Sequence, residues 1–266
     1  MRKKDHTLNE IVQITGRSKT TVYFHIRNIP LSKQKRKKIS EATRWRALRV
    51  AAARKGKALR PFKPFQSWTP ELVLLVSHLM FDGEITKSKC RYHNRSAALI
   101  KRVEDLMQLV YDYKGTKNTD TTSGVVTVSF HNVELETFLK SKSKELLKNI
   151  HVFSRSKQTE FLRAFFDDEG CMDVRLNKSL RRIRGYQNDQ EILKLVKLLL
   201  KNFDIESKLR KPNEVVISGK ENLRKFQKEI NFSKGVRLNP NRTNSIWKKD
   251  IEKRELLDIA IRSYQI

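Results

Sequence analysis

The sequence predicts an α+β protein with two pseudo-symmetric halves, each of the order αββαββα, preceded by a small all-α N-terminal domain. From residue 67 onward the chain repeats one pattern of helical and strand-like segments. An internal repeat of this length is hard to obtain by chance. The first 66 residues differ from the rest, because they are strongly basic and contain two short helical stripes. We therefore divide the chain into four parts: 1–30, 31–66, 67–150, and 151–266 with a C-terminal helix.

Positive charge dominates the chain and is concentrated near its N-terminus. The formal net charge is +28, and residues 1–66 hold 19 Lys and Arg against 3 acidic residues, a balance of +16. Such a chain is expected to bind a polyanion, because Lys and Arg that neutralise phosphates release condensed counterions. Double-stranded DNA is the partner that we expect, and charge alone leaves RNA open.

Composition also argues against several classes of protein. No apolar run approaches the roughly 20 residues of a membrane helix, and the basic N-terminus is followed by no apolar segment of a secretory signal. Cys90 and Cys171 fit neither a disulfide framework nor a zinc site. We expect a protein that is not secreted and has no membrane partner, located in the cytoplasm with the nucleoid or in an organelle.

Residues 1–30 predict two short helices around a glycine. The first stripe is apolar from Leu8 to Ile14, Gly16 interrupts it, and Ser18 caps a second stripe. This arrangement resembles a helix-turn-helix, whose second helix enters the major groove; the alternative is a helical hairpin of another small domain. The resemblance predicts DNA contacts from Arg17, Lys19, Thr20, Thr21 and Tyr23. Residues 31–66 are a basic linker, expected to be partly helical around Trp45 and to follow DNA phosphates.

One short motif occurs twice. Residues 75–83 read LVSHLMFDG and residues 162–170 read LRAFFDDEG. Each is an apolar helical run with a small residue in third place, Ser77 or Ala164, and each ends in an acid followed by glycine. One copy alone would be an ordinary helix end before a turn. Two copies, each followed by a similar segment, indicate a duplicated unit.

The segments that follow the two motifs align as well. We match Tyr92 and Asn94 with Tyr186 and Asn188, and the strand that ends at Ser129 with the one that ends at Ser218. In each half the order becomes helix, strand pair, helix, strand pair, helix.

The two motifs resemble the LAGLIDADG motif of homing endonucleases, in the single-chain form with two copies. The resemblance covers roughly residues 67–238 and implies the LAGLIDADG fold, with saddle-shaped sheets that bind DNA. Small third residues let the two motif helices approach closely. Met80 stands where the family often has its first aspartate, and Asp167 fills that place in the second copy.

The resemblance also implies a catalytic site. The acid before the terminal glycine is the catalytic and metal-binding residue, which gives Asp82 and Glu169, with Gly83 and Gly170 beside the metal. The cofactor is expected to be Mg²⁺ or Mn²⁺, because hard cations prefer carboxylate oxygens and activate water for phosphodiester hydrolysis. Asp167 and Asp168 are interpreted as helix-surface acids and are not assigned to metal.

Family enzymes often place a lysine near each metal site, after the short helix of each half. In the second half, Lys234 matches that place and is predicted to be catalytic by stabilising negative charge at the phosphate. In the first half, the match is open between Lys142 and Lys144.

Alternation with a period of two predicts basic sheet faces after each motif. We expect these faces to read base edges in the major groove, although any one of the basic residues could equally be a solubilising charge. The predicted DNA-binding residues are Lys87, Lys89, Arg91, His93, Arg175, Asn177, Arg182, Arg184, Gln187, Lys208 and Arg210.

Three functions remain open on the sequence. The first is a monomeric, site-specific homing-type DNA endonuclease that makes Mg²⁺-dependent double-strand breaks, free-standing or intron-borne because the terminal residues of an intein are missing. The second is a non-cleaving DNA-binding transcriptional regulator. The third is an RNA maturase, for which RNA would be the partner. The presence of both Asp82 and Glu169 favours the nuclease.

Overall fold

The computed structural model describes residues 1–54, 62, 64, 67–86, 89–238, 247 and 250–264. The chain forms two compact units, Met1–Pro61 and Phe62–Ile266, and each is described by itself. No helix in the described part of the chain is long and apolar enough to cross a membrane.

The first unit contains the helices that the sequence predicts. A 3₁₀ turn at Arg2–Lys4 is followed by α1 (Leu8–Thr15), α2 (Lys19–Ile26) and α3 (Lys33–Arg54). Thr7 caps α1 with a full capping box, Gly16 ends it at φ 65°, and the Ser18 side chain caps α2. The break at Gly16 and the cap at Ser18 were legible in the sequence because capping depends on residues adjacent along the chain.

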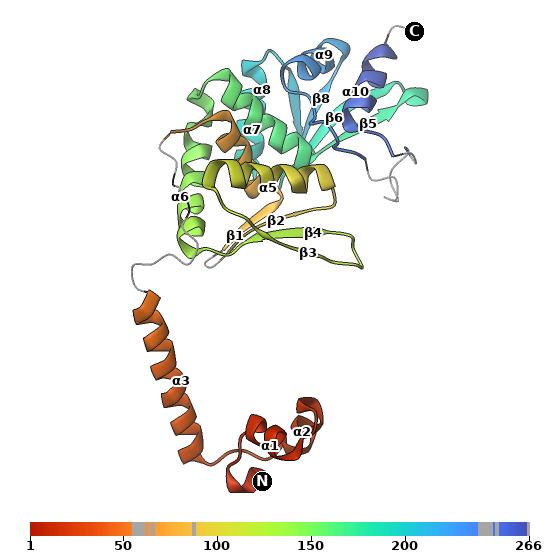
Figure 1. The fold of residues 1–266 in the computed structure, drawn as a ribbon. Helices are drawn as coiled ribbons and strands as arrows, with labels where there is room; N and C mark the ends of the chain where they lie inside the picture. Colours follow the sequence, from red (N-terminus) through yellow and green to blue (C-terminus); the bar gives the residue numbers. More distant parts are fainter. Residues whose placement is uncertain are drawn as a thin grey trace. The chain divides into compact units, whose positions relative to one another are not determined.

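The second unit repeats one topology. The first half consists of α4 (Pro70–Phe81), β1 (Gly83–Thr86), β2 (Lys89–Asn94), α5 (Ala97–Tyr111), β3 (Thr116–Thr119), β4 (Val126–Phe130) and α6 (Val133–Asn149). The second half consists of α7 (Arg155–Asp168), β5 (Gly170–Arg175), β6 (Leu180–Tyr186), α8 (Gln190–Asn202), β7 (Ser207–Arg210), β8 (Glu214–Ser218) and α9 (Lys220–Glu229). Both sheets are antiparallel, with the orders β1-β2-β4-β3 and β5-β6-β8-β7. The predicted fold class is confirmed, and α10 (Lys253–Arg262) follows the second half (Figure 1).

The two motif helices pack against each other at the centre of this unit (Figure 1). Ser77 and Ala164 are fully buried, as expected for small residues that let two helix backbones approach. Phe81 at the end of α4 meets the rings of Phe161 and Phe165 of α7 at centroid distances of 5.5 and 5.3 Å. The contact between the halves is therefore part of the hydrophobic core.

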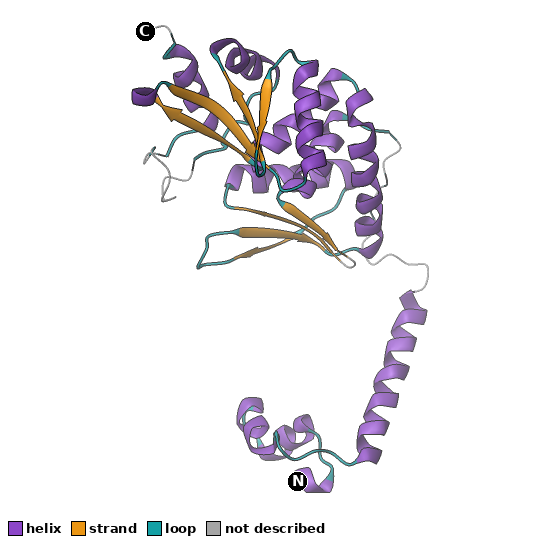
Figure 2. Cartoon of the chain, turned by 180° about the vertical axis from the view of Figure 1, so that it is seen from behind, coloured by secondary structure: helices purple, strands orange, loops and turns teal. Residues whose placement is uncertain are grey.

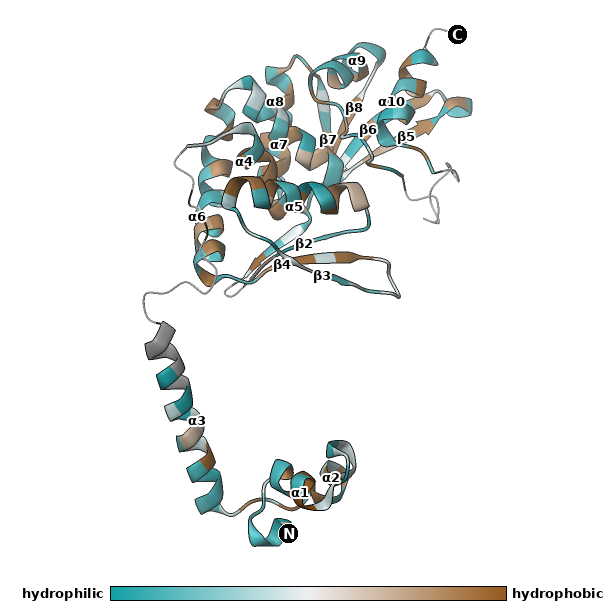
Figure 3. Cartoon of the chain, in the orientation of Figure 1, coloured by the Kyte–Doolittle hydropathy of each residue, from teal (hydrophilic) through white to brown (hydrophobic). Residues whose placement is uncertain are grey.

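Helices cover one face of each sheet, and the other face carries polar side chains. In the first sheet, Tyr92, Val128 and Phe130 point into the core and are fully buried. In the second sheet, Ile183 and Ile217 pair across β6 and β8 and are also fully buried. Figure 2 shows the strands and the helices that pack on them, and Figure 3 shows the hydrophobic residues that these elements carry.

The strand register corrects part of the predicted alignment. Gly83 pairs with Tyr92 whereas Gly170 pairs with Gly185, so Tyr92 corresponds to Gly185 and not to Tyr186. Likewise Arg91 pairs with Ser129, whereas Arg182 pairs with Ser218. The two serines are therefore not equivalent. The error arose because the β5–β6 hairpin is longer than the β1–β2 hairpin, and letter matches do not reveal hairpin length.

One further expectation is wrong. Asp167 and Asp168 are not surface acids, since the side chain of each is 0% exposed. They lie on the face of α7 that meets the first half and the loop after α9.

Gly83 and Gly170 are required by close packing. A Cβ on Gly83 would lie 2.2 Å from the carbonyl oxygen of Leu79, and one on Gly170 would lie 2.3 Å from that of Phe166. We expect Gly170→Ala to lower the free energy of unfolding by about 2–4 kcal/mol, because the backbone must shift to relieve the overlap. Denaturant unfolding measures this loss.

Gly124→Ala is the matched control. Gly124 has φ 69° with open space around its Cβ position, so only conformational strain of about 1 kcal/mol is expected. Equal losses for Gly170→Ala and Gly124→Ala would contradict the packing argument.

Candidate active site

The ends of the two motif helices form the centre of the site. Asp82 is the C-cap of α4 and Glu169 is the C-cap of α7. The strand that follows each acid is joined to its neighbour in the same way. The N–H of His93 donates to the carbonyl of Asp82 at 3.0 Å, and the N–H of Tyr186 donates to the carbonyl of Glu169 at 3.1 Å. The helix ends thus present one carboxylate from each half.

Each carboxylate has an amide neighbour at the same place in its half. Nδ2 of Asn94 donates to Oδ2 of Asp82 at 2.8 Å, and Nε2 of Gln187 is 3.3 Å from Oε1 of Glu169. The shorter acid has the shorter amide and the longer acid the longer one. The structural equivalent of Asn94 is therefore Gln187, and not the Asn188 that the sequence alignment chose.

Burial and neighbouring negative charges make both acids hard to ionise. Burial raises the pKa of Asp82 to about 7, and the charge of Asp168 adds to this rise. Burial likewise raises the pKa of Glu169 to about 7, followed by the charges of Asp82 and Asp168. Since the charge of Asp82 acts on Glu169, the structure brings the two predicted acids into one electrostatic site.

Asp168 ties α7 to the first half. Its Oδ2 lies 2.8 Å from Nδ1 of His78 on α4, and its Oδ1 accepts a hydrogen bond from the Tyr92 hydroxyl on β2 at 2.6 Å. Burial and the Asp168 charge raise the pKa of Tyr92, so the hydroxyl remains a donor. This buried carboxylate positions both helices and adds negative charge behind the acid pair.

The equivalent positions of the other half are apolar. Equivalent positions follow from the strand register and from the number of residues that separate each one from its acid. Phe81 corresponds to Asp168, Phe165 to His78, and Gly185 to Tyr92. A Cβ on Gly185 would lie 2.4 Å from the Phe165 ring, so glycine makes room for that ring. The contact around Asp168 is thus made by hydrogen-bonded polar groups, and the equivalent contact around Phe81 is made by aromatic rings.

A buried lysine that sequence reasoning missed binds the backbone carbonyls at the C-terminal end of α7. Lys253 opens α10 and is 7% exposed, and its ammonium donates to the carbonyls of Phe166, Asp167 and Gly170 at 3.3, 2.7 and 2.7 Å. Its charge lowers the pKa of both Asp82 and Glu169, against the larger effect of burial. Burial in turn lowers the pKa of Lys253.

Lys234 lines a pocket that does not include the acid pair. It is exposed in the loop after α9 and lines a pocket together with Arg102 and Arg254. Its charge is not among the causes of the pKa shifts of the acid pair, whereas that of Lys253 is. In the first half, Lys142 is bonded to Glu145 on α6 at 2.6 Å. Lys253 is therefore a cation whose charge acts on both acids.

The donor set fits a hard divalent cation. Within the described residues, no group of three or more His, Cys, Asp or Glu side chains is placed to hold a metal ion, so the carboxylate pair would be completed by water and substrate. Mg²⁺ is bound in this way, through one or two carboxylates plus phosphate oxygens. The carbonyl of Gly170 already accepts a hydrogen bond from Lys253, so the side chains of Asp82 and Glu169 are the groups that would hold a metal.

Residues 156–231 match the family model described as a LAGLIDADG-like domain. The chain contains a LAGLIDADG-like domain. Full-length DUF199/WhiA from Thermatoga maritima has a similar fold, with a TM-score of 0.51 and 15% identity over 76% of this chain and 63% of that one. This chain therefore spans less than two thirds of that protein, and the likeness concerns the fold.

Structures of the homing endonuclease I-DmoI are also similar. One of its mesophilic variants gives a TM-score of 0.49 and 17% identity over 60% of this chain and 90% of that one. Other I-DmoI structures are complexes with DNA and Mn, or with target DNA in the presence of Mg. No characterised protein matches in a comparison by sequence.

The two sheets present the alternating residues on one face, as the sequence predicts. Arg91 pairs with Ser129 and His93 with Thr127 across β2 and β4. Lys89 begins β2, but its side chain lies outside the described part, as does all of Lys87. Arg91 lies 3.8 Å from the Glu84 carboxylate, so part of its charge is already paired.

The second sheet face is a network of ion pairs. Arg182 and Arg175 bond to Asp173 at 2.7 and 3.0 Å, and Arg184 bonds to Glu214. Asp173 has a lowered pKa through these hydrogen bonds, although burial opposes them as the largest single effect. The arginines are therefore held in place by acids that the sequence reasoning did not pair with them.

The remaining predicted DNA-binding residues fall in different places. Lys208 and Arg210 pair with Val216 and Glu214 across β7 and β8 and share the outer face with Arg184. Asn177 lies in a 3₁₀ turn, Leu176–Lys178, beyond the end of β5. Gln187 faces Glu169 and belongs to the acid site.

In the first unit, the residues predicted to contact DNA are exposed, namely Arg17 before α2 and Lys19, Thr20, Thr21 and Tyr23 on it. Thr21 also bonds to Ser18 in the helix cap at 2.8 Å. Phe24 was missed by sequence reasoning: it is 60% exposed beside Tyr23, with Arg27 over its ring. Only Val22 of α2 is buried.

The raised pKa values give the acids a pH-dependent effect on stability. Because the folded state holds each proton more tightly than the unfolded chain, their ionisation lowers stability progressively from about pH 4 to pH 7. We expect Asp82→Asn to raise the free energy of unfolding by about 1–3 kcal/mol at pH 8 without metal, and to change it little at pH 4. Thermal unfolding of variant and wild type at both pH values measures this, and a gain of equal size at pH 4 would contradict it.

Lys253→Met tests the buried ammonium. Three carbonyls lose a charged donor, so the free energy of unfolding is expected to fall by about 2–4 kcal/mol, and the pKa values of Asp82 and Glu169 should rise further. Carboxyl ¹³C NMR titration and denaturant unfolding measure the two effects. Lys234→Met is the matched control and should leave both unchanged; a larger effect there than at Lys253 would support the prediction that Lys234 is the catalytic lysine.

Proposed function

We propose that the chain is a site-specific DNA endonuclease of the homing type, which makes double-strand breaks that depend on Mg²⁺ or Mn²⁺. The observation that carries the proposal is the acid pair: one carboxylate from each half, at the ends of two packed helices, each beside an amide. The LAGLIDADG-like match of residues 156–231 supports it. One acid per half suits a cut in each of two antiparallel strands.

In this proposal the residues of the site have separate chemical roles. Bound divalent metal would activate water and neutralise charge at the scissile phosphate, held by Asp82 and Glu169. Asn94 and Gln187 orient the carboxylates through their amide groups. Lys253 fixes the end of α7 and partly offsets the negative charge of the acids. Because both acids have a pKa of about 7, a metal would release protons on binding near neutral pH.

The outer sheet faces and the first unit would supply the contacts to a long DNA site. Arginines already held by acids are pre-oriented, and each keeps further N–H groups for base edges or phosphates. In the first unit, α2 would enter the major groove and the basic helix α3 would follow phosphates. We propose that the protein acts as a monomer, because both halves are present in one chain.

A cleavage selection tests the function. The full chain is incubated with a randomised duplex library in Mg²⁺, next to the Asp82→Asn/Glu169→Gln double variant and an EDTA control. We expect cut ends with a defined overhang that disappear in both controls, because removal of both carboxylates removes the metal ligands.

The other outcomes identify the alternatives. Tight binding of a defined duplex with no cut ends, in Mg²⁺ or Mn²⁺, would replace the nuclease with a non-cleaving DNA-binding regulator. Tight binding of a host intron RNA that is unaffected by loss of the acids would instead favour a maturase.

A further inference from the structure

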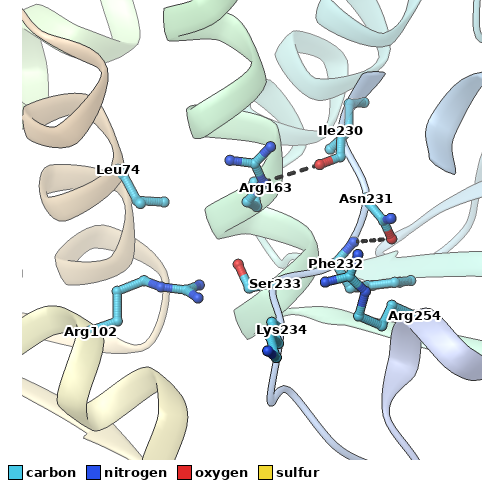
Figure 4. A pocket seen from close by; sticks show the side chains of 9 residues that line it. All are labelled: Leu74, Arg102, Arg163, Ile230, Asn231, Phe232, Ser233, Lys234 and Arg254. Atoms are coloured by element: carbon cyan, nitrogen blue, oxygen red, sulfur yellow. Dashed lines mark hydrogen bonds between the residues drawn. The ribbon is translucent and has the colours of Figure 1, made fainter. Parts of the chain in front are cut away.

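A second polar site lies in the second unit, away from the acid pair. It is a pocket of about 330 Å³ between the two halves, lined from α4, α5, α7, α10 and the loop after α9. Four of its lining residues are cations: Arg102, Arg163, Lys234 and Arg254. Figure 4 shows these side chains around the opening. None of the residues of the acid pair or its amides lines it.

The pocket keeps an excess of positive charge. Arg102 is paired with Asp167 at 3.2 Å, and Arg163 is paired with Glu160 and donates to the carbonyl of Ile230 at 3.1 Å. Within the described part of the chain, neither Lys234 nor Arg254 has an ion pair. No lining residue is acidic. Two cations are therefore anchored and two are available to a ligand.

The loop that carries Lys234 is fixed by its neighbours. Asn231 follows the C-cap of α9 with φ 55° and accepts a hydrogen bond from the N–H of Phe232 at 2.8 Å. The N–H of Ser233 donates to Asp167 at 2.9 Å. Because the same carboxylate holds Arg102, the loop and α5 keep a constant relation across the pocket. The Ser233 hydroxyl and the Asn231 amide add neutral donors to its wall.

We propose that this pocket binds a phosphoryl group. Guanidinium and ammonium groups with no facing carboxylate attract anions, and arginine matches the oxygens of phosphate in pairs. The volume is at the lower end of the range for small-molecule sites. The cations come from helices and a loop, whereas the predicted DNA-reading arginines of the second unit, such as Arg91, Arg182 and Arg184, lie on the outer sheet faces. Two sources supply the same chemistry: a phosphate of the DNA backbone and a free phosphorylated compound.

Two double variants of equal charge separate the pocket from the general charge of the protein. Lys234→Gln/Arg254→Gln removes the two available cations. The control, Lys228→Gln/Arg262→Gln, removes two exposed cations of α9 and α10 that do not line the pocket. Both variants are first compared with wild type by thermal unfolding, so that a folding defect is recognised.

The first arm measures calorimetric binding of pyrophosphate to the full chain at constant ionic strength. The second measures duplex DNA binding with ethylation interference, which reports contacts to single phosphates. At least tenfold weaker pyrophosphate binding in the pocket variant alone supports a site for a free phosphorylated compound. Loss of interference at one or two phosphates in that variant alone supports a backbone site.

Identical behaviour of the two folded double variants in both arms would overturn the proposal, because any binding would then reflect overall charge. Neither arm requires cleavage. The pocket can therefore fail while the nuclease stands, or stand while the nuclease fails.

Discussion

The packing of α4 against α7 is the constraint on which the site depends. Both helices end at the point where they meet, so the residue that caps each one is brought next to its counterpart. The small side chains of Ser77 and Ala164 permit this approach and are fully buried. Gly83 and Gly170 permit the sharp exit into the first strand of each half, because a Cβ at either position would overlap a backbone carbonyl. Without these four residues, the two carboxylates would not share one environment.

That packing creates an electrostatic difficulty, which the surrounding residues moderate. Asp82, Asp167, Asp168 and Glu169 lie close together near the helix ends, and burial raises the pKa values of Asp82 and Glu169. Asp168 is satisfied by His78 and Tyr92, and Asp167 by Arg102 and Ser233. Lys253 places a cation beneath the end of α7, where the helix carbonyls also attract positive charge. Asp82 and Glu169 remain hard to ionise, and a bound divalent metal would stabilise their ionised forms.

The two halves share a topology, but the buried residues at equivalent positions differ. At one crossing, Asp168 reaches His78 and Tyr92; at the equivalent crossing, Phe81 packs on Phe165, which lies over Gly185. The outer faces differ too, because Asp173 and Glu214 hold the arginines of the second sheet, whereas Arg91 of the first lies 3.8 Å from the Glu84 carboxylate. Duplicated halves in one chain are free to diverge in this way, since neither has to fit a copy of itself.

The sequence by itself determined the features that depend on neighbouring residues or on period. The motif helices, the cap at Ser18, the turn at Gly16, the alternation along β2 and β6, and the acids Asp82 and Glu169 were all legible there. The tertiary structure decided what depends on distant contacts: the equivalence of Asn94 with Gln187, the burial of Asp167 and Asp168, and the arrival of Lys253 at the end of α7. Lys253 lies 84 residues after Glu169 in the chain, and no local pattern distinguishes it among so many lysines. The physical reason is that hydrogen bonding along a helix or strand is encoded within a few residues, whereas the environment of a buried charge is set by whichever segments the fold brings together.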